Sequence, residues 1–520
     1  MGMHTYYYNL GMAFTEVCNS NAARPALRYS DHFHSYSDLF QCAESLGALL
    51  ISHGMKRGDV IAIGNNKRYL SYALMIAALR LGIAYVNIDV MSPLTRNSDI
   101  LKVSGASLLF YDDPQYKTKM QDLADNHQCR LLELSPELIR PISQTDRDIQ
   151  NQLIQKVDGS CIAYVMFTSG STGIPKGVAV THQNILHFIS WGQQCFQINN
   201  EDIFANLSPM YFDNSVFDFY VALFSGASLS PVSRELLSKP YELVDYVGRM
   251  ECSVWFSVPS LLIYLMTMKA LGNIKLQTLR YIIFGGEGYP KTELKKLYNL
   301  FSKQARLVNV YGPTECTCIC SAYLINEQDF FEMDGLPPLG TLNCNFDYRI
   351  LNEENKDAKT GELCLIGPNV AAGYFNDLQR TSNSFITLCE PEYFMKRMYR
   401  TGDIVREVEG TLYFVGRKDN QIKHMGYRIE LEEIEHALVK LPEINQAAVF
   451  YQRTNSSYGK LIAFVASTAE TDEKILLNRL AKLLPEYMIP SRLFIQPELP
   501  KNANGKVDRQ LLYHNAPEYA

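Results

Sequence analysis

Residues 161–191 read CIAYVMFTSGSTGIPKGVAVTHQNILHFISW. The stretch opens with an apolar segment, CIAYVMF, that has the length and composition of a buried strand. A loop of small residues follows, then a second short strand at 178–180 and a helical pattern that begins at Thr181, a typical N-cap residue. YIIF at 281–284, running into GGEGYP, repeats the step from strand to glycine turn. The alternation of apolar strands with amphipathic helices predicts an α/β fold.

The character of the chain changes near residue 417. A polar stretch at 417–420 follows the strand pattern TLYFV and precedes a helical pattern, LEEIEHALVKL, at 431–441. A strand pattern at 446–451 and a helical pattern at 473–484 come next. We expect a large N-terminal α/β domain over 1–416, a hinge at 417–420 and a small, mobile α+β lid domain over 421–520.

Composition excludes several classes of protein. The 520 residues carry a formal net charge of -6, with 47% hydrophobic and 20% charged residues, so no basic surplus points to nucleic acid or an anionic membrane. Neither a signal peptide nor a run of about 18 apolar residues is evident, which favours a cytoplasmic protein without a membrane span. Twelve cysteines in so long a chain do not make a disulfide scaffold.

Three of the cysteines, Cys316, Cys318 and Cys320, alternate along the chain. This spacing predicts one face of a strand. No second CxxC or histidine-rich element accompanies them, so semi-buried thiols are favoured over a zinc site.

The loop Thr168–Gly177, TSGSTGIPKG, has the chemistry of a phosphate site. Three glycines permit close approach of a ligand, and hydroxyls, backbone N–H groups and Lys176 suit a polyphosphate. The loop is not a Walker A motif, because Pro175 and Gly177 stand where that motif needs glycine and serine or threonine. No GxGxxG is present, and the adjoining strand argues against a flexible Ser/Gly linker.

The loop resembles the phosphate loop of the adenylate-forming superfamily, which contains acyl-CoA synthetases, luciferases and nonribosomal-peptide adenylation domains. YGPTE at 311–315, YRTGD at 399–403, GRKDNQIKHMGYRIELEEIE at 416–435 and NGKVDR at 504–509 are similar to the family's later motifs, in the family's order. The long third motif is more similar to the amino-acid-activating members than to fatty acyl-CoA ligases.

The resemblance implies a nucleotide site with ATP as substrate and Mg²⁺ as cofactor. Tyr311 would stack on adenine, Thr314 would contact the α-phosphate, Glu315 would hold Mg²⁺ and Asp403 would accept hydrogen bonds from the ribose hydroxyls. The remaining implied nucleotide contacts are Thr168, Ser169, Gly170, Ser171, Thr172, Gly173, Lys176, Gly285, Gly286, Glu287, Asn309, Gly312, Phe414 and Arg417.

In this family the small domain serves two half-reactions. The resemblance implies that Lys506 bridges the substrate carboxylate and the α-phosphate during adenylation. Rotation about Asp419 would then present Lys423 and Gly426, with Gly426 close to an incoming phosphopantetheine arm.

The resemblance also implies an amino-acid pocket. Asp213 stands where amino-acid-activating relatives pair an Asp with the substrate ammonium, and this residue disfavours aryl acids. The side-chain pocket would be lined by Asn214, Phe217, Ser257, Ile282, Phe284, Val310, Cys318 and Ile319. Two phenylalanine rings in this set favour a small or medium substrate.

These observations predict an enzyme that activates an amino acid with ATP and loads it onto a carrier protein. Because the chain ends soon after NGKVDR, we expect a stand-alone ligase and a separate phosphopantetheinylated carrier. An acyl-CoA synthetase for a small acid, a D-alanine:carrier-protein ligase, a ligase that transfers to an amine and a non-catalytic protein of the same fold are the alternatives.

Overall fold

The computed structural model describes residues 7–273, 276–389, 395–453, 459–467, 471–501 and 507–515. The chain folds into two compact units. The first comprises residues 1–90, 101–166 and 177–418, and the second comprises residues 91–100, 167–176 and 419–520. Among the described residues, no helix is both long and apolar enough to cross a membrane.

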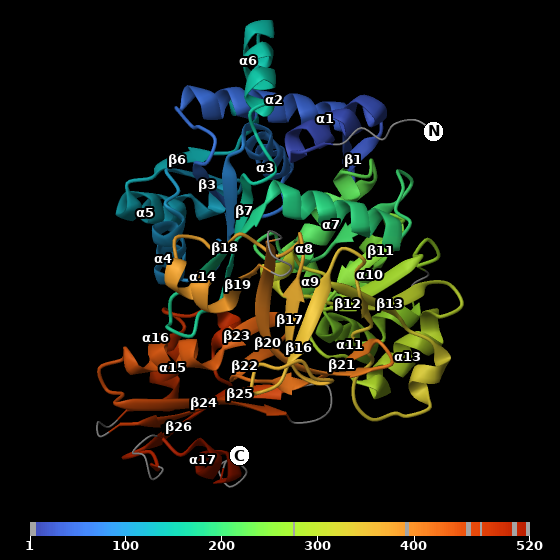
Figure 1. The fold of residues 1–520 in the computed structure, drawn as a ribbon. Helices are drawn as coiled ribbons and strands as arrows, with labels where there is room; N and C mark the ends of the chain where they lie inside the picture. The colour runs from blue at the N-terminus through green and yellow to red at the C-terminus, as the bar shows by residue number, and fades with distance from the viewer. Residues whose placement is uncertain are drawn as a thin grey trace. The chain divides into compact units, whose positions relative to one another are not determined.

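The first unit is built on a nine-stranded sheet whose centre is parallel (Figure 1). The strands β13, β12, β11, β9, β10 and β1 run parallel, and the antiparallel strands β15 and β14 at one edge and β2 at the other complete the sheet. In sheet order they are β15 (Thr341–Leu342), β14 (Ser321–Leu324), β13 (Arg306–Tyr311), β12 (Tyr281–Gly285), β11 (Val254–Ser257), β9 (Ile203–Asn206), β10 (Ser228–Pro231), β1 (Pro25–Arg28) and β2 (Phe33–Ser35).

A seven-stranded sheet contains the strands that flank the phosphate loop. Its order is β18 (Gly373–Tyr374), β8 (Lys176–Thr181), β7 (Ile162–Thr168), β4 (Ala84–Ile88), β3 (Val60–Gly64), β5 (Leu108–Tyr111) and β6 (Arg130–Glu133). The predicted strands at 161–167 and 178–180 are therefore confirmed as β7 and β8. The predicted N-cap is confirmed as well, because the Thr181 side chain accepts from the backbone N–H of Asn184 at the start of α7 (His182–Cys195).

Helices cover these sheets on the faces where apolar side chains point. The helices α1 (Leu10–Asn21), α2 (Tyr36–Ser52), α3 (Tyr69–Leu81) and α6 (Gln144–Ile154) pack on one another (Figure 1). The nine-stranded sheet separates two apolar clusters. Side chains from alternate positions of its strands enter one cluster shared with α7 and another shared with α10 (Pro240–Arg249), α11 (Pro259–Thr267) and α13 (Lys291–Phe301).

A third sheet of the first unit contains the YRTGD motif. Its strands are β16 (Asp347–Leu351), β17 (Thr360–Ile366), β20 (Lys396–Val408) and β19 (Phe385–Leu388), and β21 (Thr411–Arg417) pairs with β20. The β20–β21 register places Asp403 directly opposite Arg417.

The second unit contains an α+β core of its own. The strands β24 (Gln446–Arg453), β25 (Gly459–Ala466) and β26 (Arg492–Gln496) form a sheet against α15 (Leu431–Val439) and α16 (Glu473–Leu480). A hairpin of β22 (Gln421–His424) and β23 (Tyr427–Glu430) precedes α15, and α17 (Arg509–Asn515) follows β26. The predicted α/β fold with a large N-terminal part and a smaller C-terminal part is thus confirmed.

Two segments that we expected in the N-terminal domain group with the C-terminal part. They are residues 91–100 and 167–176, which include the phosphate loop. Hydrogen bonds from Ser169 to Arg428 and from Gly170 to Glu433 join residues 167–176 to the C-terminal part. The ion pair of Arg96 with Glu433 joins residues 91–100 to it. The boundaries 1–416, 417–420 and 421–520 remain a prediction.

His182, the first residue of α7, makes the stability of the first unit depend on pH. Its Nδ1 accepts the backbone N–H of Leu10 at 3.0 Å, and burial lowers the pKa of its ring from 6.5 to about 3. Because the folded protein holds the ring neutral, this stabilisation is complete above pH 6.5 and is lost progressively as the pH falls toward 3.

We expect His182→Asn to abolish that component, which amounts to at most ~1.4 kcal/mol per pH unit below 6.5. Melting temperatures of both proteins from pH 7 to pH 4 provide the measurement. The wild type should be the more stable at pH 7, and the gap should narrow steadily with acidification. A gap that stays constant with pH would contradict the assignment.

Candidate functional site: the carboxyl edge of the parallel strands

Several predicted site residues follow the carboxyl ends of neighbouring parallel strands. Asp213 lies in the segment after β9, Gly286 and Glu287 follow β12, and the segment 312–315 follows β13. In open α/β sheets, ligands bind outside the carboxyl ends of the strands. The tertiary fold therefore gathers at one edge three motifs that lie far apart in the chain.

Asp213 faces the 311–315 motif. It occupies the N-cap position of the short helix α8 (Asn214–Val216), yet its side chain makes no capping hydrogen bond. Instead its carboxylate accepts the hydroxyl of Thr314 at 2.5 Å. The carboxylate predicted to bind an ammonium and the hydroxyl predicted to contact the α-phosphate are thus direct neighbours.

Asp403 is held by two of the predicted nucleotide residues. The phenol of Tyr311 donates to its Oδ2 at 2.6 Å, and Nη1 of Arg417 donates to its Oδ1 at 2.6 Å. Burial, together with the adjacent Asp403 charge, raises the pKa of Tyr311 well above its ordinary value, so the phenol remains a proton donor. Phe414 lies on β21 and pairs with Val405 of β20, in the same hairpin as Asp403 and Arg417.

Glu315 is a fully buried carboxylate whose Oε1 accepts the hydroxyl of Tyr374 at 2.8 Å. In the described part of the chain, no group of three or more His, Cys, Asp or Glu side chains is placed to hold a metal ion. A single carboxylate fits Mg²⁺, which is commonly held by one or two carboxylates together with phosphate oxygens and water. Sequence reasoning missed Tyr374, because it lies in no motif and is 59 positions from Glu315 in the chain.

Two of the predicted nucleotide glycines are required by the protein's own backbone. A Cβ on Gly285 would lie 2.4 Å from the carbonyl oxygen of Val310, and one on Gly312 would lie 2.2 Å from that of Cys318. Gly286 has a φ of 88°, which favours glycine. Close chain packing therefore explains 285 and 312 without a ligand.

Asn309 and Glu287 also have structural partners. The Asn309 side chain donates to the carbonyl of Pro338 at 2.8 Å, and Glu287 accepts the backbone N–H of Ser260 at 2.7 Å. The first contact holds β13 and the second holds the turn after β12.

The predicted side-chain pocket is divided by the nine-stranded sheet. Phe217, Val310, Cys318 and Ile319 belong to the apolar cluster shared with α7, whereas Ile282 and Phe284 belong to the cluster on the opposite face. Ser257 accepts the indole N–H of Trp255, another member of that opposite cluster, at 2.8 Å. Asn214 is buried beside the turn at Gly286. Ser257, Ile282 and Phe284 therefore lie apart from the other predicted pocket residues.

The side chains that do face Phe217 come from the adjacent positions. Phe256 lies 5.4 Å from the Phe217 ring, centroid to centroid, and Phe256 pairs with Ile283 in the β11–β12 register. Both belong to the cluster that contains Val310. The alternation of side chains along a strand could have identified this face. Gly285 pairs with Val310, and Ile283, two residues before Gly285, lies on the same face of β12.

The predicted strand through the three cysteines is wrong. Cys316 ends a 3-10 turn (Thr314–Cys316), and Thr317 and Cys318 both have positive φ, so β14 begins only at Ser321. The absence of a side chain at Gly312 permits the Cys318 carbonyl to pack against it, so the segment bends back and does not continue as a strand. All three thiols are buried and none is in a disulfide within the described residues. Burial raises the pKa of Cys318 well above its ordinary value.

The phosphate loop lies in the second unit. Thr168 Oγ1 is buried and has no hydrogen-bond partner among the described residues, which is consistent with a ligand-facing hydroxyl. Ser169 donates to the Arg428 carbonyl at 2.8 Å, and Lys176 Nζ lies 3.5 Å from Glu430. Ser171 and Thr172 are exposed, and Gly173 has a φ of 76°.

The lid residues lie in the β22–β23 hairpin and before it. Asp419 accepts the backbone N–H of Gln421, and Lys423 pairs with Arg428 in the hairpin register. Gly426 has a φ of 82° in the two-residue turn, a conformation that favours glycine apart from any ligand. Lys506 lies outside the described residues.

Comparison with known proteins agrees with this arrangement. The AMP-binding enzyme profile matches residues 14–375, and the AMP-binding enzyme C-terminal domain profile matches residues 433–506. An L-proline–[L-prolyl-carrier protein] ligase of Pseudomonas fluorescens is 34% identical over 91% of this chain and 93% of its own length. A D-alanine–D-alanyl carrier protein ligase of Bacillus licheniformis is 30% identical over 92% of this chain and 93% of its own length.

A solved structure extends the comparison to the fold. The Vibrio cholerae adenylation domain AlmE, in complex with glycyl-adenosine-5'-phosphate, matches with a TM-score of 0.82 at 23% identity, over 100% of this chain and 99% of that one. The fold is that of an α/β enzyme with a distinct C-terminal domain. The chain belongs to the AMP-binding enzyme family.

The packing around Gly285 and Gly312 leads to a stability prediction. We expect Gly285→Ala and Gly312→Ala each to lower the free energy of unfolding by about 1–3 kcal/mol or more, because the obstructing atoms are backbone. Gly272→Ala is the matched control, since a Cβ there meets nothing within 4 Å. Melting temperatures without ligand provide the measurement, and an unchanged value for 285 and 312 would assign these glycines to ligand contact alone.

Proposed function

We propose that this AMP-binding enzyme activates an amino acid with ATP and transfers it to the phosphopantetheine thiol of a carrier protein. Similarity to the prolyl and D-alanyl carrier-protein ligases over nine-tenths of the chain supports this class of reaction. The observation that carries the proposal is the hydrogen bond between Thr314 and Asp213. It supports the proposal because a carboxylate, which could accept an ammonium, lies beside a hydroxyl of the 311–315 motif.

The chemistry requires two steps. First, a carboxylate oxygen of the amino acid attacks the α-phosphorus, forming an O–P bond as the bond to the β-phosphate oxygen breaks and pyrophosphate leaves. Second, the carrier's thiolate attacks the acyl carbon, forming a C–S bond as AMP leaves with the C–O bonding pair. Both steps are governed by positioning and by stabilisation of developing charge. Lys506 is proposed as the residue that bridges the carboxylate and α-phosphate in the first step.

The nucleoside would bind at Tyr311, Asp403 and Arg417. Among the described residues, each carboxylate oxygen of Asp403 accepts one side-chain hydrogen bond, so a second lone pair could accept from a ribose hydroxyl. The hydrogen bond from Arg417 orients the carboxylate, and the Tyr311 ring is fixed through its phenol. These contacts support a preformed ribose site.

Glu315 would hold Mg²⁺, with Tyr374 fixing the orientation of the carboxylate. The cation would supply charge neutralisation on the phosphate oxygens.

Asp213 would select an amine-bearing acid. It is the only charged group of the predicted substrate set, and the rest of that set is apolar or neutral. A desolvated ammonium paired with this carboxylate would discriminate strongly against acids that lack the amine. An acyl-CoA synthetase acting on a small acid would gain nothing from a carboxylate there.

The test of the proposal is ATP–pyrophosphate exchange with a panel of amino acids and their desamino analogues. We expect Asp213→Ala to lower kcat/KM for the preferred amino acid, with a loss of transition-state stabilisation of about 3–5 kcal/mol. Such a loss is typical of a buried ion pair from which one partner has been removed. The desamino acid should suffer far less.

Thr314→Val is the comparison variant, since it removes the neighbouring hydroxyl and leaves the carboxylate. It should slow exchange with both acids in similar proportion. An Asp213→Ala protein that retains its full preference for the amine would refute the amino-acid assignment and favour the acyl-CoA synthetase alternative.

The choice of amino acid should respond to the face of the sheet that contains Phe217. We expect Phe256→Ala to enlarge the pocket and move the preference in the exchange panel toward larger side chains. Phe284→Ala, on the opposite face, should cost about 3–5 kcal/mol of stability and leave the order of preference unchanged. A change of preference in the second variant alone would favour the pocket that the sequence predicted.

A further inference from the structure

Within the second unit, the phosphate loop is held by the segment 428–433. The Ser169 hydroxyl donates to the Arg428 carbonyl at 2.8 Å, and its oxygen accepts the backbone N–H of Glu430 at 3.2 Å. The backbone N–H of Gly170 donates to Oε2 of Glu433 at 3.1 Å. One carbonyl, one backbone N–H and one side-chain carboxylate of this segment therefore contact the groups that would bind phosphates.

A carboxylate in these positions resembles a phosphate oxygen in charge and in accepting N–H groups. Glu433 takes the Gly170 N–H, and Glu430 lies 3.5 Å from the Lys176 ammonium. The loop cannot give the same N–H to Glu433 and to a nucleotide phosphate with good geometry. The acidic segment would also repel a polyphosphate that arrives while it is in place.

Glu433 is buried and takes its charge partner from a distant part of the sequence. Arg96, itself buried on α4 (Leu94–Ser104), pairs through Nη1 with Oε1 of Glu433, while Oε2 of the same carboxylate accepts from Gly170. A buried carboxylate is stable only when it is paired and hydrogen-bonded. Arg96 supplies that pairing, although it lies in none of the sequence motifs.

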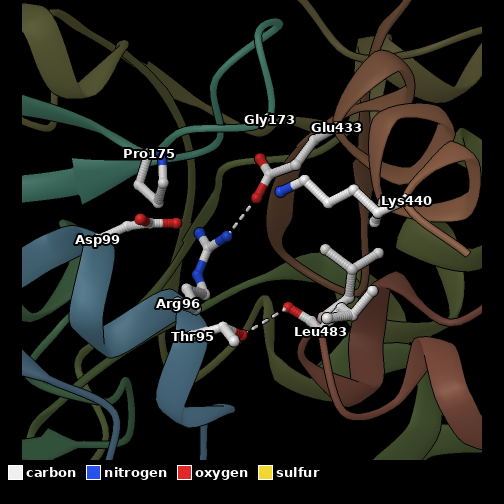
Figure 2. A pocket seen from close by; sticks show the side chains of 10 residues that line it. Thr95, Arg96, Asp99, Gly173, Pro175, Glu433, Lys440 and Leu483 are labelled. Atoms are coloured by element: carbon white, nitrogen blue, oxygen red, sulfur yellow. Dashed lines mark hydrogen bonds and ion pairs between the residues drawn. The ribbon is translucent and has the colours of Figure 1, made fainter. Parts of the chain in front are cut away.

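Figure 2 shows the arrangement around this pair. The Arg96 guanidinium points toward Glu433 at a cavity of about 190 Å³ that is also lined by Asp99, Pro175 and Lys440. In the described part of the second unit, the ion pair of Glu433 is made by Arg96 and not by Lys440, whose side chain is exposed. The cavity is thus lined by two cationic side chains, Arg96, which pairs with Glu433, and Lys440, which serves as a control.

We propose that Arg96 is a positioning residue that acts through Glu433. The pair keeps the carboxylate on the phosphate loop, so that binding of the β- and γ-phosphates requires release of the 428–433 segment. This inference rests on the proposed function. AMP and an acyl-adenylate lack the β- and γ-phosphates and bind without displacing Glu433. ATP and pyrophosphate must displace it, so the loop distinguishes the nucleotide of the first half-reaction from that of the second.

The test compares two nucleotides on the full chain by isothermal titration calorimetry. The probes are α,β-methylene-ATP, which is not cleaved, and AMP. We expect Glu433→Gln to tighten the ATP analogue by about tenfold, because one unit of like charge is removed near the phosphates, and to leave AMP unchanged. Lys440→Met, the control, should leave the ratio of the two affinities close to that of the wild type.

A double-mutant cycle assigns the role of Arg96. Arg96→Met should raise the ratio of the affinity for the ATP analogue to that for AMP, but by less than Glu433→Gln does. In the Glu433→Gln background, Arg96→Met should not change this ratio further. A weaker ATP analogue in both backgrounds would mean that Arg96 binds phosphate directly, which overturns the proposal. An unchanged ratio in Glu433→Gln would overturn it as well.

Failure of the proposed function has a different signature. A wild type that binds neither nucleotide would refute the activity itself. A wild type that binds both, with a ratio insensitive to Glu433, would refute only the role of the pair.

Discussion

The parallel register of β9, β11, β12 and β13 is the constraint on which the site depends. Parallel neighbours bring their carboxyl ends to one edge, and each strand there delivers a different piece of chemistry. β9 leads to Asp213, β12 to the turn at Gly286 and β13 to Tyr311 and Thr314. Asp213 and Thr314 are 101 positions apart in the chain. They can form a hydrogen bond because the strands that precede them, β9 and β13, end at the same edge of the sheet.

The same strands impose a second constraint through the alternation of their side chains. Even and odd positions of β12 enter different apolar clusters, so a shift of one residue exchanges the lining of the site for the packing of the opposite face. Phe256 therefore packs on Phe217 and Ile283 belongs to the same cluster, whereas Phe284 packs on Tyr289. In such a sheet, the face on which a side chain lies determines whether it can line the pocket, whatever its residue type.

Charge is handled differently in the two units. In the first unit, Asp403 and Glu315 are held by tyrosine hydroxyls, with Arg417 as the one guanidinium partner of Asp403 described at the site. In the second unit, the phosphate loop meets Glu430 and Glu433, and Arg96 balances the latter. A loop that is rich in N–H groups accepts a carboxylate for the same reason that it accepts a phosphate. The competition between them follows from that shared chemistry.

The sequence by itself determined the fold class, β7 and β8, the N-cap at Thr181 and the order of the motifs, because these depend on local periodicity and short runs of residues. It misplaced the cysteines 316–320, where close backbone packing overrides the alternating pattern. Only the tertiary structure decided which motif residues touch and which face of β12 lines the cluster around Phe217. It also decided that Tyr374 contacts the predicted site residue Glu315 and that Arg96 pairs with Glu433 of the 416–435 motif. Those outcomes depend on strand register and on contacts between segments far apart in the chain, which no local pattern records.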